Sequence, residues 1–289
     1  MSSNFSTDYS SNCNPQKGRF SAKKSLGQNF FNDPNIVNKI VASAMLNKNS
    51  IVLEIGPGLG ALTLPLSYHS KKIVAIEKDD QLTKELKNLI KNLGIKNIEI
   101  INSDILKEFK NPRDSQMFKK LGPSYQVVAN IPYCLTGPII RALLETNPQP
   151  EEITLIVQKE VAQRICNIPP NMSLLSIAVQ YYANPKILFY ISKNCFYPIP
   201  KVDSAALKLS PIKNYSPKDA QFFKVVKAGF LSPRKQLLNN LSTGLKIDKE
   251  KIKASFELAN LDYKRRAETL EIGDWEGLID SFKKLRIKF

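Results

Sequence analysis

Apolar residues form short runs along the first two thirds of the chain, and helical patterns separate several of them. Seven runs have the length of a β-strand: Ile51–Ile55, Ile73–Ile76, Ile98–Ile101, Tyr125–Ala129, Ile153–Val157, Ile187–Ile191 and Ala205–Leu209. Strands that are apolar at successive positions are buried on both faces, as in a parallel sheet between two helical layers. The pattern predicts an α/β fold with a mostly parallel seven-stranded sheet, helices on both faces, and the last two strands as an antiparallel edge pair.

Helix signals accompany these strands. Asp33 and Pro34 predict a helix start, because aspartate caps an N-terminus and proline fits the first turn. Apolar residues at helical spacing mark a second helix over Leu82–Leu93. Pro, Asn and Ser cluster at 211–217, which is typical of a linker. Beyond it only helices are predicted, over Phe222–Phe230, Arg234–Leu241, Lys249–Leu258 and Trp275–Leu285.

These changes divide the chain into three parts. Residues 1–18 are rich in Ser and Asn and lack an apolar core, so we expect a flexible tail rather than a signal peptide. Residues 19–210 make up the predicted α/β domain. Residues 211–289 carry 17 Lys and Arg against 10 Asp and Glu, which predicts a small basic helical domain.

Charge and composition narrow the class of function. The chain has 42 Lys and Arg, 26 Asp and Glu, and a net charge of +16, which favours a polyanionic partner such as nucleic acid. A solvated lysine-rich surface is the alternative. No apolar run is long enough to span a membrane. The four cysteines form no Cys-x-x-Cys pair and His69 is the only histidine, so we expect neither a metal site nor a Ser-His-Asp hydrolase.

A glycine-rich turn follows the first of these strands, with the spacing Gly56-Pro57-Gly58-Leu59-Gly60. Glycine lets the backbone approach a ligand closely. Dinucleotide-binding folds use G-x-G-x-x-G to seat a pyrophosphate, whereas the G-x-G-x-G spacing here suits a ligand without phosphates. A turn that only packs a helix on a strand is the alternative.

Acidic residues follow the next two strands. Glu77 ends one strand and is placed to bind ribose hydroxyls, and Asp104 follows the other and is placed to bind an adenine amino group. Ligands in open α/β sheets bind at the carboxyl ends of the strands, where the glycine turn and both acids fall. Together they predict an adenosine-containing cofactor.

The tetrapeptide Asn130-Ile131-Pro132-Tyr133 follows the fourth strand and resembles the catalytic element of amino-methyltransferases, in the form used on adenine N6 of ribosomal RNA. The adenine amine is a poor nucleophile because its lone pair is delocalised. The Asn130 side chain and the Ile131 carbonyl could accept its hydrogens and direct the lone pair at a methyl group. Pro132 stiffens the backbone and Tyr133 can stack on an unpaired base. Positioning then does most of the catalysis, without a metal. A proline turn with an aromatic plug is the alternative.

This resemblance extends over roughly residues 19–285 to the ribosomal RNA adenine N6,N6-dimethyltransferase family. It implies a Rossmann-like class I methyltransferase fold with S-adenosyl-L-methionine as cofactor. Glu77 and Asp104 match the family's ribose and adenine positions, and Gly56 inherits a backbone contact to the cofactor. Asn130 matches the catalytic position, which also contacts the cofactor.

Two further segments carry the resemblance. Gly27–Phe31 is similar to a segment that closes over the cofactor in the family, so Asn29 and Phe31 inherit cofactor contacts. Phe196–Ala205 is similar to a segment whose aromatic residue lines the pocket for the target base, a role that Phe196 inherits. A core aromatic is the alternative for Phe196.

The C-terminal motifs favour the housekeeping subgroup over the macrolide-resistance subgroup. Phe230–Leu241 and Arg265–Glu268 resemble its signatures. The resemblance therefore implies dimethylation of two adjacent adenosines in the 3′-terminal hairpin loop of small-subunit (16S) rRNA. It also implies action on the pre-30S subunit during ribosome biogenesis, by a cytoplasmic monomer. Four basic residues are candidates for rRNA phosphate contacts: Arg234, Lys235, Arg265 and Arg266.

Some positions depart from the family pattern, and two other functions stay open. Ser232-Pro233 and Cys134-Leu135 replace residues that are usual there, which leaves target preference open. One alternative is a non-catalytic RNA-binding ribosome assembly or transcription factor that retains the fold. The other is a nicotinamide-dependent dehydrogenase, which the glycine spacing and the lack of a suitable histidine disfavour.

Overall fold

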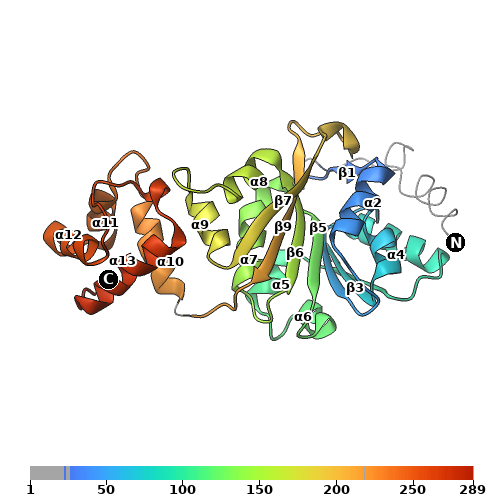
Figure 1. Cartoon of the computed structure of the whole chain (residues 1–289). Helices are drawn as coiled ribbons and strands as arrows, with labels where there is room; N and C mark the ends of the chain where they lie inside the picture. The colour runs from blue at the N-terminus through green and yellow to red at the C-terminus, as the bar shows by residue number, and fades with distance from the viewer. Residues whose placement is uncertain (1–22, 24–26, 218, 289) are drawn as a thin grey trace. The chain divides into compact units, whose positions relative to one another are not determined.

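The computed structural model describes residue 23, residues 27–217 and residues 219–288, so the predicted tail at 1–18 lies outside the described residues. The chain forms two compact units (Figure 1). The first takes in the described residues up to 162 together with 184–212. The second takes in residues 163–183 and the chain from 213 onward. The predicted domain limits at 210 and 211 stay a prediction, and the grouping of 163–183 with the C-terminal part was not foreseen.

A seven-stranded sheet forms the centre of the first unit, in the order β4-β3-β2-β5-β6-β9-β7. The pairings from β4 to β6 are parallel, whereas β9 runs antiparallel to β6. All seven predicted strands are present, and β9 lies between β6 and the edge strand β7. Their bounds are β2 Ile51–Ile55, β3 Lys72–Glu77, β4 Ile98–Asn102, β5 Gln126–Asn130, β6 Glu152–Gln158, β7 Ala183–Ile191 and β9 Ser204–Ile212.

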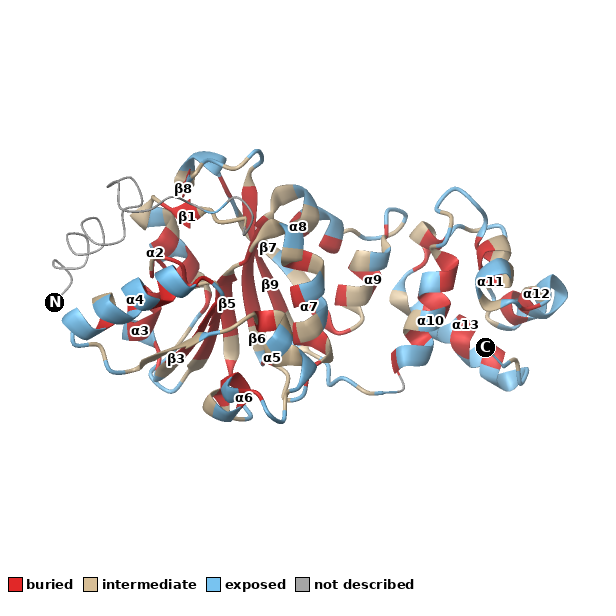
Figure 2. Cartoon of the chain, turned by 180° about the vertical axis from the view of Figure 1, so that it is seen from behind, coloured by how far each residue is buried: buried red, intermediate tan, exposed pale blue. Residues whose placement is uncertain are grey.

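The strands are apolar because both faces of the sheet are covered. Strands β5 and β6 are largely red, the colour of buried residues, in Figure 2. Val52 and Leu53 point to opposite faces of β2, yet both are fully buried. On one face, Val52 shares a core cluster with Ile40 and Leu66 of the helices. The helices of this unit are α2 Pro34–Ser43, α3 Thr63–His69, α4 Asp80–Asn92, α5 Ile105–Lys110, α6 Gln116–Leu121 and α7 Thr136–Glu145, with short 3-10 helices η2 Tyr133–Leu135 and η3 Lys193–Cys195. Helix α8 (Lys159–Ile165) begins in this unit and ends in the second.

Helix α2 begins where its predicted capping residue places it, whereas α4 ends before the last residue of its predicted apolar pattern. Asp33 accepts a hydrogen bond from the Asn35 amide at 2.9 Å and Pro34 begins α2, which confirms that prediction. The apolar face of α4 is buried at Leu82 and Leu86, but the helix ends at Asn92. Leu93, expected on that face, is therefore an exposed C-cap residue.

A small ribbon stands apart from the main sheet. Strand β1 (Phe30–Phe31) pairs antiparallel with β8 (Phe196–Tyr197), with Phe31 opposite Phe196. Their two rings lie 4.7 Å apart between centroids. The Phe30 ring lies so close to the glycine turn that a Cβ at Gly58 would come within 3.0 Å of it. The ribbon thus ties the N-terminal segment to the turn after β2.

The second unit is built from helices around its own core. Trp275, Phe256 and Phe282 are fully buried in one cluster. The helix α11 begins at Leu237, not at Arg234 as predicted, because residues 231–236 form an irregular turn. The side-chain amide of Asn240 holds this turn by bonds to the carbonyls of Gly229 at 2.7 Å and Ser232 at 2.9 Å. The helices are α9 Leu174–Gln180, α10 Asp219–Gly229, α11 Leu237–Leu245, α12 Lys249–Leu258, α13 Ile272–Lys284 and the 3-10 helix η4 Ala267–Thr269.

No helix in the described part of the chain combines the length and the apolarity that a bilayer span requires.

Candidate active site

The carboxyl ends of β2, β3 and β5 border a cavity of about 240 Å³. Because β3 and β5 lie on opposite sides of β2, the segments that follow these strands diverge and leave a crevice. Every site residue predicted in the first unit lines this cavity except Phe196. These lining residues are Asn29, Phe31, Gly56, Glu77, Asp104, Asn130, Ile131, Pro132 and Tyr133.

The glycine turn after β2 has two tasks. Gly56 has a φ of +69° and lines the cavity, where a Cβ would come 3.7 Å from the Asn130 carbonyl oxygen. Gly60 has a φ of +87°, and a Cβ there would come 2.7 Å from the Leu86 side chain. The first glycine therefore opens the cavity wall, and the last lets the turn pack on α4. The packing alternative therefore applies at Gly60, whereas a ligand contact at Gly56 stays a prediction.

Glu77 ends β3 with its carboxylate inside the site. One oxygen accepts the Gly58 amide at 3.1 Å and the other accepts the Asp79 amide at 2.9 Å. Burial raises the pKa of Glu77, and these two hydrogen bonds oppose the rise. Each oxygen keeps a second lone pair, so the carboxylate can still accept hydrogen bonds from a diol.

Asp104 lines the cavity next to the start of α5 and is held in place. One oxygen caps α5 by accepting the Leu106 amide at 3.0 Å, and the other pairs with Lys78 at 2.9 Å. Partial burial pushes the pKa of Asp104 up, but the bonds from Lys78 and Leu106 outweigh it and lower the pKa. Asp104 is therefore an anionic acceptor at neutral pH, as an adenine amino group would require.

Asn130 is the last residue of β5, and its amide is oriented by a segment far away in sequence. The Asn130 Nδ2 donates to the Asn29 carbonyl oxygen at 2.9 Å. This bond occupies the donor end of the amide and leaves Oδ1 as an acceptor at the cavity. The acceptor role of Asn130 toward a substrate amine stays a prediction.

The aromatic residues divide between cavity and core. Tyr133 lines the cavity, and its hydroxyl is 2.6 Å from the Ser204 hydroxyl. Burial raises the pKa of Tyr133, with the Ser204 bond opposing the rise. Phe196 is fully buried against Phe31 and is not among the residues that line the cavity. A contact between Phe196 and a target base therefore stays a prediction.

Glu54 is a cavity residue that was not predicted from the sequence. Its side chain is 1% exposed, and its Oε2 has no hydrogen-bond partner among the described residues. Burial raises the pKa of Glu54 to about 8, the Thr63 hydroxyl opposing the rise and Glu77 adding to it. A buried carboxyl with an open acceptor favours a ligand that donates hydrogen bonds. The available signal was a charged residue inside the apolar strand Ile51–Ile55.

The predicted RNA contacts lie in the second unit, where two of the segments meet. The Leu237 amide donates to the Arg265 carbonyl at 2.8 Å, which brings the turn at 231–236 beside residues 265–266. Arg234 and Lys235 are exposed in that turn, and Arg266 is also exposed, 3.9 Å from Glu268.

Arg265 has a different environment from the other three basic residues. Its guanidinium donates to Thr269 and pairs with Asp274 at 3.1 Å, and about a third of its side chain is exposed. Arg265 therefore stabilises the local fold, whereas Arg234, Lys235 and Arg266 are exposed to solvent.

The chain is similar in sequence to a family of known proteins. Residues 19–281 match the family model described as "Ribosomal RNA adenine dimethylase". The ribosomal RNA small subunit methyltransferase A of Dehalococcoides mccartyi (strain CBDB1) is 40% identical over 264 residues, which cover 89% of this chain and 87% of that protein. The protein of the same name from Enterococcus faecalis (strain ATCC 700802 / V583) is 37% identical over 295 residues, covering 96% and 98%.

Solved structures agree with the sequence matches. A dimethyladenosine transferase from Plasmodium falciparum has a TM-score of 0.72 and 25% identity, covering 89% of this chain and 98% of that chain. The 23S rRNA methyltransferase ErmE has a TM-score of 0.67 and 24% identity, covering 88% and 99%, and shows a likeness of fold alone. The predicted class I methyltransferase fold, with its C-terminal helical part, is confirmed.

Proposed function

The chain belongs to the ribosomal RNA adenine dimethylase family, and we propose that it dimethylates N6 of two adjacent adenosines in the 3′-terminal hairpin loop of small-subunit (16S) rRNA. S-adenosyl-L-methionine is the cofactor, and it supplies an electrophilic methyl group on a sulfonium. The observation that carries the proposal is the Asn130 amide, whose donor end is occupied by Asn29 and whose acceptor end is left for an amine.

The residues of the cavity fit this cofactor. Glu77 would accept hydrogen bonds from the ribose hydroxyls and Asp104 from the adenine amino group. Gly56 would let the cofactor lie against the backbone, since the space that a side chain would need is left open. Glu54, whose Oε2 has no partner among the described residues, would accept from the ammonium of the amino-acid end. An acceptor for each donor group of the cofactor is thus present.

Asn130 and its neighbours would act on the substrate amine. Asn130 Oδ1 and the Ile131 carbonyl accept its two hydrogens, which turns the nitrogen lone pair out of conjugation with the ring. Tyr133, held at its hydroxyl by Ser204, offers its ring for stacking on the base. After transfer, the proton of the alkylated amine passes to water, because a carboxamide has no basic site of useful strength. These residues position the reactants and do not exchange protons with them.

The basic residues of the second unit would bind the RNA backbone. Arg234, Lys235 and Arg266 are exposed and suited to phosphate contacts. We assign Arg265 mainly to bracing, because its guanidinium is engaged by Thr269 and Asp274. We further propose that the substrate is the pre-30S subunit in the cytoplasm and that the protein acts as a monomer. Unpaired loop bases suit such an enzyme, since they reach a cavity at little unstacking cost.

A direct test uses subunits that lack the modification. Small subunits from cells without this protein are incubated with the purified chain and labelled S-adenosyl-L-methionine, and the RNA is analysed by mass spectrometry. We expect two adjacent N6,N6-dimethyladenosines in the 3′-terminal hairpin. Tight subunit binding with no label in the RNA would instead support the non-catalytic assembly factor, which the family's methyltransferase relatives do not favour.

A further inference from the structure

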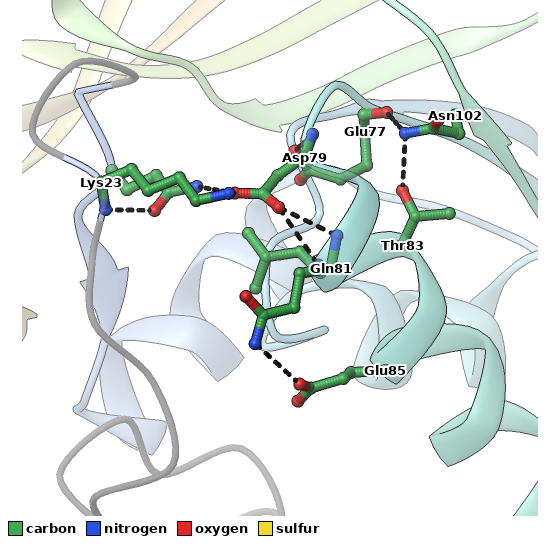
Figure 3. Close-up of polar contacts among 9 residues, drawn as sticks. Lys23, Glu77, Asp79, Gln81, Thr83, Glu85 and Asn102 are labelled. Atoms are coloured by element: carbon green, nitrogen blue, oxygen red, sulfur yellow. Dashed lines mark hydrogen bonds and ion pairs between the residues drawn. The ribbon is translucent and has the colours of Figure 1, made fainter.

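Asp79 does not line the cavity, yet its side chain binds Gln28, next to the residue whose carbonyl accepts Asn130. Figure 3 shows Asp79 between Lys23 and the start of α4. It is the N-cap of α4, where its Oδ1 accepts the Gln81 amide at 3.0 Å. Its Oδ2 accepts Gln28 Nε2 at 3.2 Å and pairs with Lys23 Nζ at 2.8 Å. Asp79 is only 4% exposed. A buried carboxylate needs its donors, so the N-terminal segment is bound at this point rather than merely adjacent to it.

The same segment is anchored again at residues 30–32. Phe30 begins the ribbon with β8, and the Asn32 amide donates to the Cys195 carbonyl at 3.0 Å. Asn29 lies between the two anchors, and its side chain donates to the Gly27 carbonyl at 3.2 Å. Its own carbonyl is therefore fixed in space, and this carbonyl accepts Asn130 Nδ2 at 2.9 Å.

The orientation of the Asn130 amide decides whether it can act. A carboxamide has an acceptor end and a donor end of nearly the same shape. Turned by half a revolution, Asn130 would present N–H groups to the adenine amine, which is itself a donor. The Asn29 carbonyl selects the productive orientation because it pairs only with the donor end.

We propose that Asp79 is a positioning residue for methyl transfer, which through Gln28 and the Asn29 carbonyl keeps Asn130 Oδ1 facing the cavity. The proposal rests on the proposed function of the site. The main cofactor contacts should survive a change of the Asp79 side chain, because Glu77 is held by the backbone amides of Gly58 and Asp79, and Phe31 is held by its pairing with Phe196. Loss of the Asp79 side chain should therefore lower kcat and leave cofactor affinity nearly unchanged.

Three variants isolate this effect. Asp79→Asn keeps a capping oxygen for α4 but replaces the acceptor of Gln28 and Lys23 by a donor. Gln28→Ala breaks the same link and leaves α4 untouched. Asp80→Asn is the matched control, because it removes one charge from the same helix end at an exposed position.

Steady-state methylation of unmodified small subunits supplies the first readout. We expect kcat to fall about tenfold in Asp79→Asn and in Gln28→Ala, as for the loss of one charge-assisted hydrogen bond. The cofactor Kd of Asp79→Asn should stay within about twofold of wild type, and Asp80→Asn should match wild type throughout. The double variant should be no slower than either single one, because both break one link. Additive losses, an unchanged kcat, or a Kd effect without a kcat effect would overturn the proposal.

A second readout does not depend on turnover. With 15N-asparagine labelling, the Asn130 side-chain NH2 signal is assigned by its loss in Asn130→Asp, and its exchange with water is measured without RNA. We expect exchange at least about tenfold faster in Asp79→Asn than in wild type or Asp80→Asn. Equal exchange rates would overturn the proposal even if kcat fell. A wild-type chain that methylates no rRNA would count against the proposed function alone. The exchange measurement would still test whether Asp79 positions the Asn130 amide.

Discussion

In the first unit Glu77, Asp104 and Asn130 stand at or just after the ends of β3, β4 and β5, and each is held by a hydrogen bond to another segment. In the second unit Arg234 and Lys235 lie exposed in a turn between helices. The first arrangement fixes where each acceptor points, so the loss of one group should be costly. The exposed basic residues of the second unit supply positive charge for a flexible polyanion, and each contributes only a small part of the binding free energy. Four sets of substitutions can test this difference.

The largest effect is expected at Asn130. Asn130→Ala removes the oriented acceptor, and we expect methylation of small subunits to fall at least about a hundredfold. Cofactor affinity, measured by calorimetry, should change little because other residues bind the ribose and adenine. Turnover like that of wild type would remove Asn130 from catalysis and would weaken the contrast between the units.

Glu77 should come next, with an effect on binding instead of turnover. Glu77→Ala removes two charge-assisted acceptors for the ribose, and we expect the cofactor Kd to rise about 10- to 100-fold. Glu85→Ala, on an exposed face of α4, is the matched control and should bind like wild type. An unchanged Kd in calorimetry would contradict the ribose assignment.

At Glu54 we expect an effect on stability, because its buried carboxyl group lowers the free energy of unfolding when it ionises. Its pKa is raised from 4.5 to about 8 by burial, with Thr63 opposing and Glu77 adding to the rise. The folded chain therefore keeps a proton that the unfolded chain releases above pH 4.5, so wild-type stability falls as the pH rises from about 4.5 to 8.

Glu54→Gln replaces the carboxyl by an amide that stays uncharged over this pH range. In the absence of cofactor we expect the variant to exceed wild type by on the order of 1–2 kcal/mol at pH 8, and to differ little at pH 5. Thermal unfolding across this pH range is the measurement. Equal pH dependence of Tm in the two proteins would show that Glu54 is ionised in the folded state.

The smallest effects are expected at the exposed basic residues. Arg234→Ala and Lys235→Ala should each weaken RNA binding a few-fold and reduce the salt slope of binding by about 1. Arg265→Ala should instead lower Tm, because Arg265 braces Thr269 and Asp274. Filter binding at several salt concentrations separates the two classes. A salt slope unchanged in Arg234→Ala and Lys235→Ala would remove them from the RNA contact surface.

Features that depend on nearby residues could be predicted from the sequence better than features that depend on contacts between distant segments. The strands, the start of α2 at Asp33 and the bounds of α12 were predicted because caps and apolar periods act within a few residues. The start of α11 was predicted three residues early, since the Asn240 bonds that hold the preceding turn have no signal in that turn. Phe196 shows the same limit: its motif indicates an aromatic near the site, and packing on Phe31 decides which way it faces.

The sequence by itself determined the alternation of strands and helices, the glycine spacing, the acids that end two strands and the basic C-terminal part, because each depends on neighbours along the chain. Only the tertiary structure decided that Glu54 is buried without a partner for its Oε2 among the described residues, and that Asn29 orients Asn130 across 101 positions. Such contacts arise when strand order and helix packing bring separate segments together, and their energies depend on burial that a linear pattern does not contain.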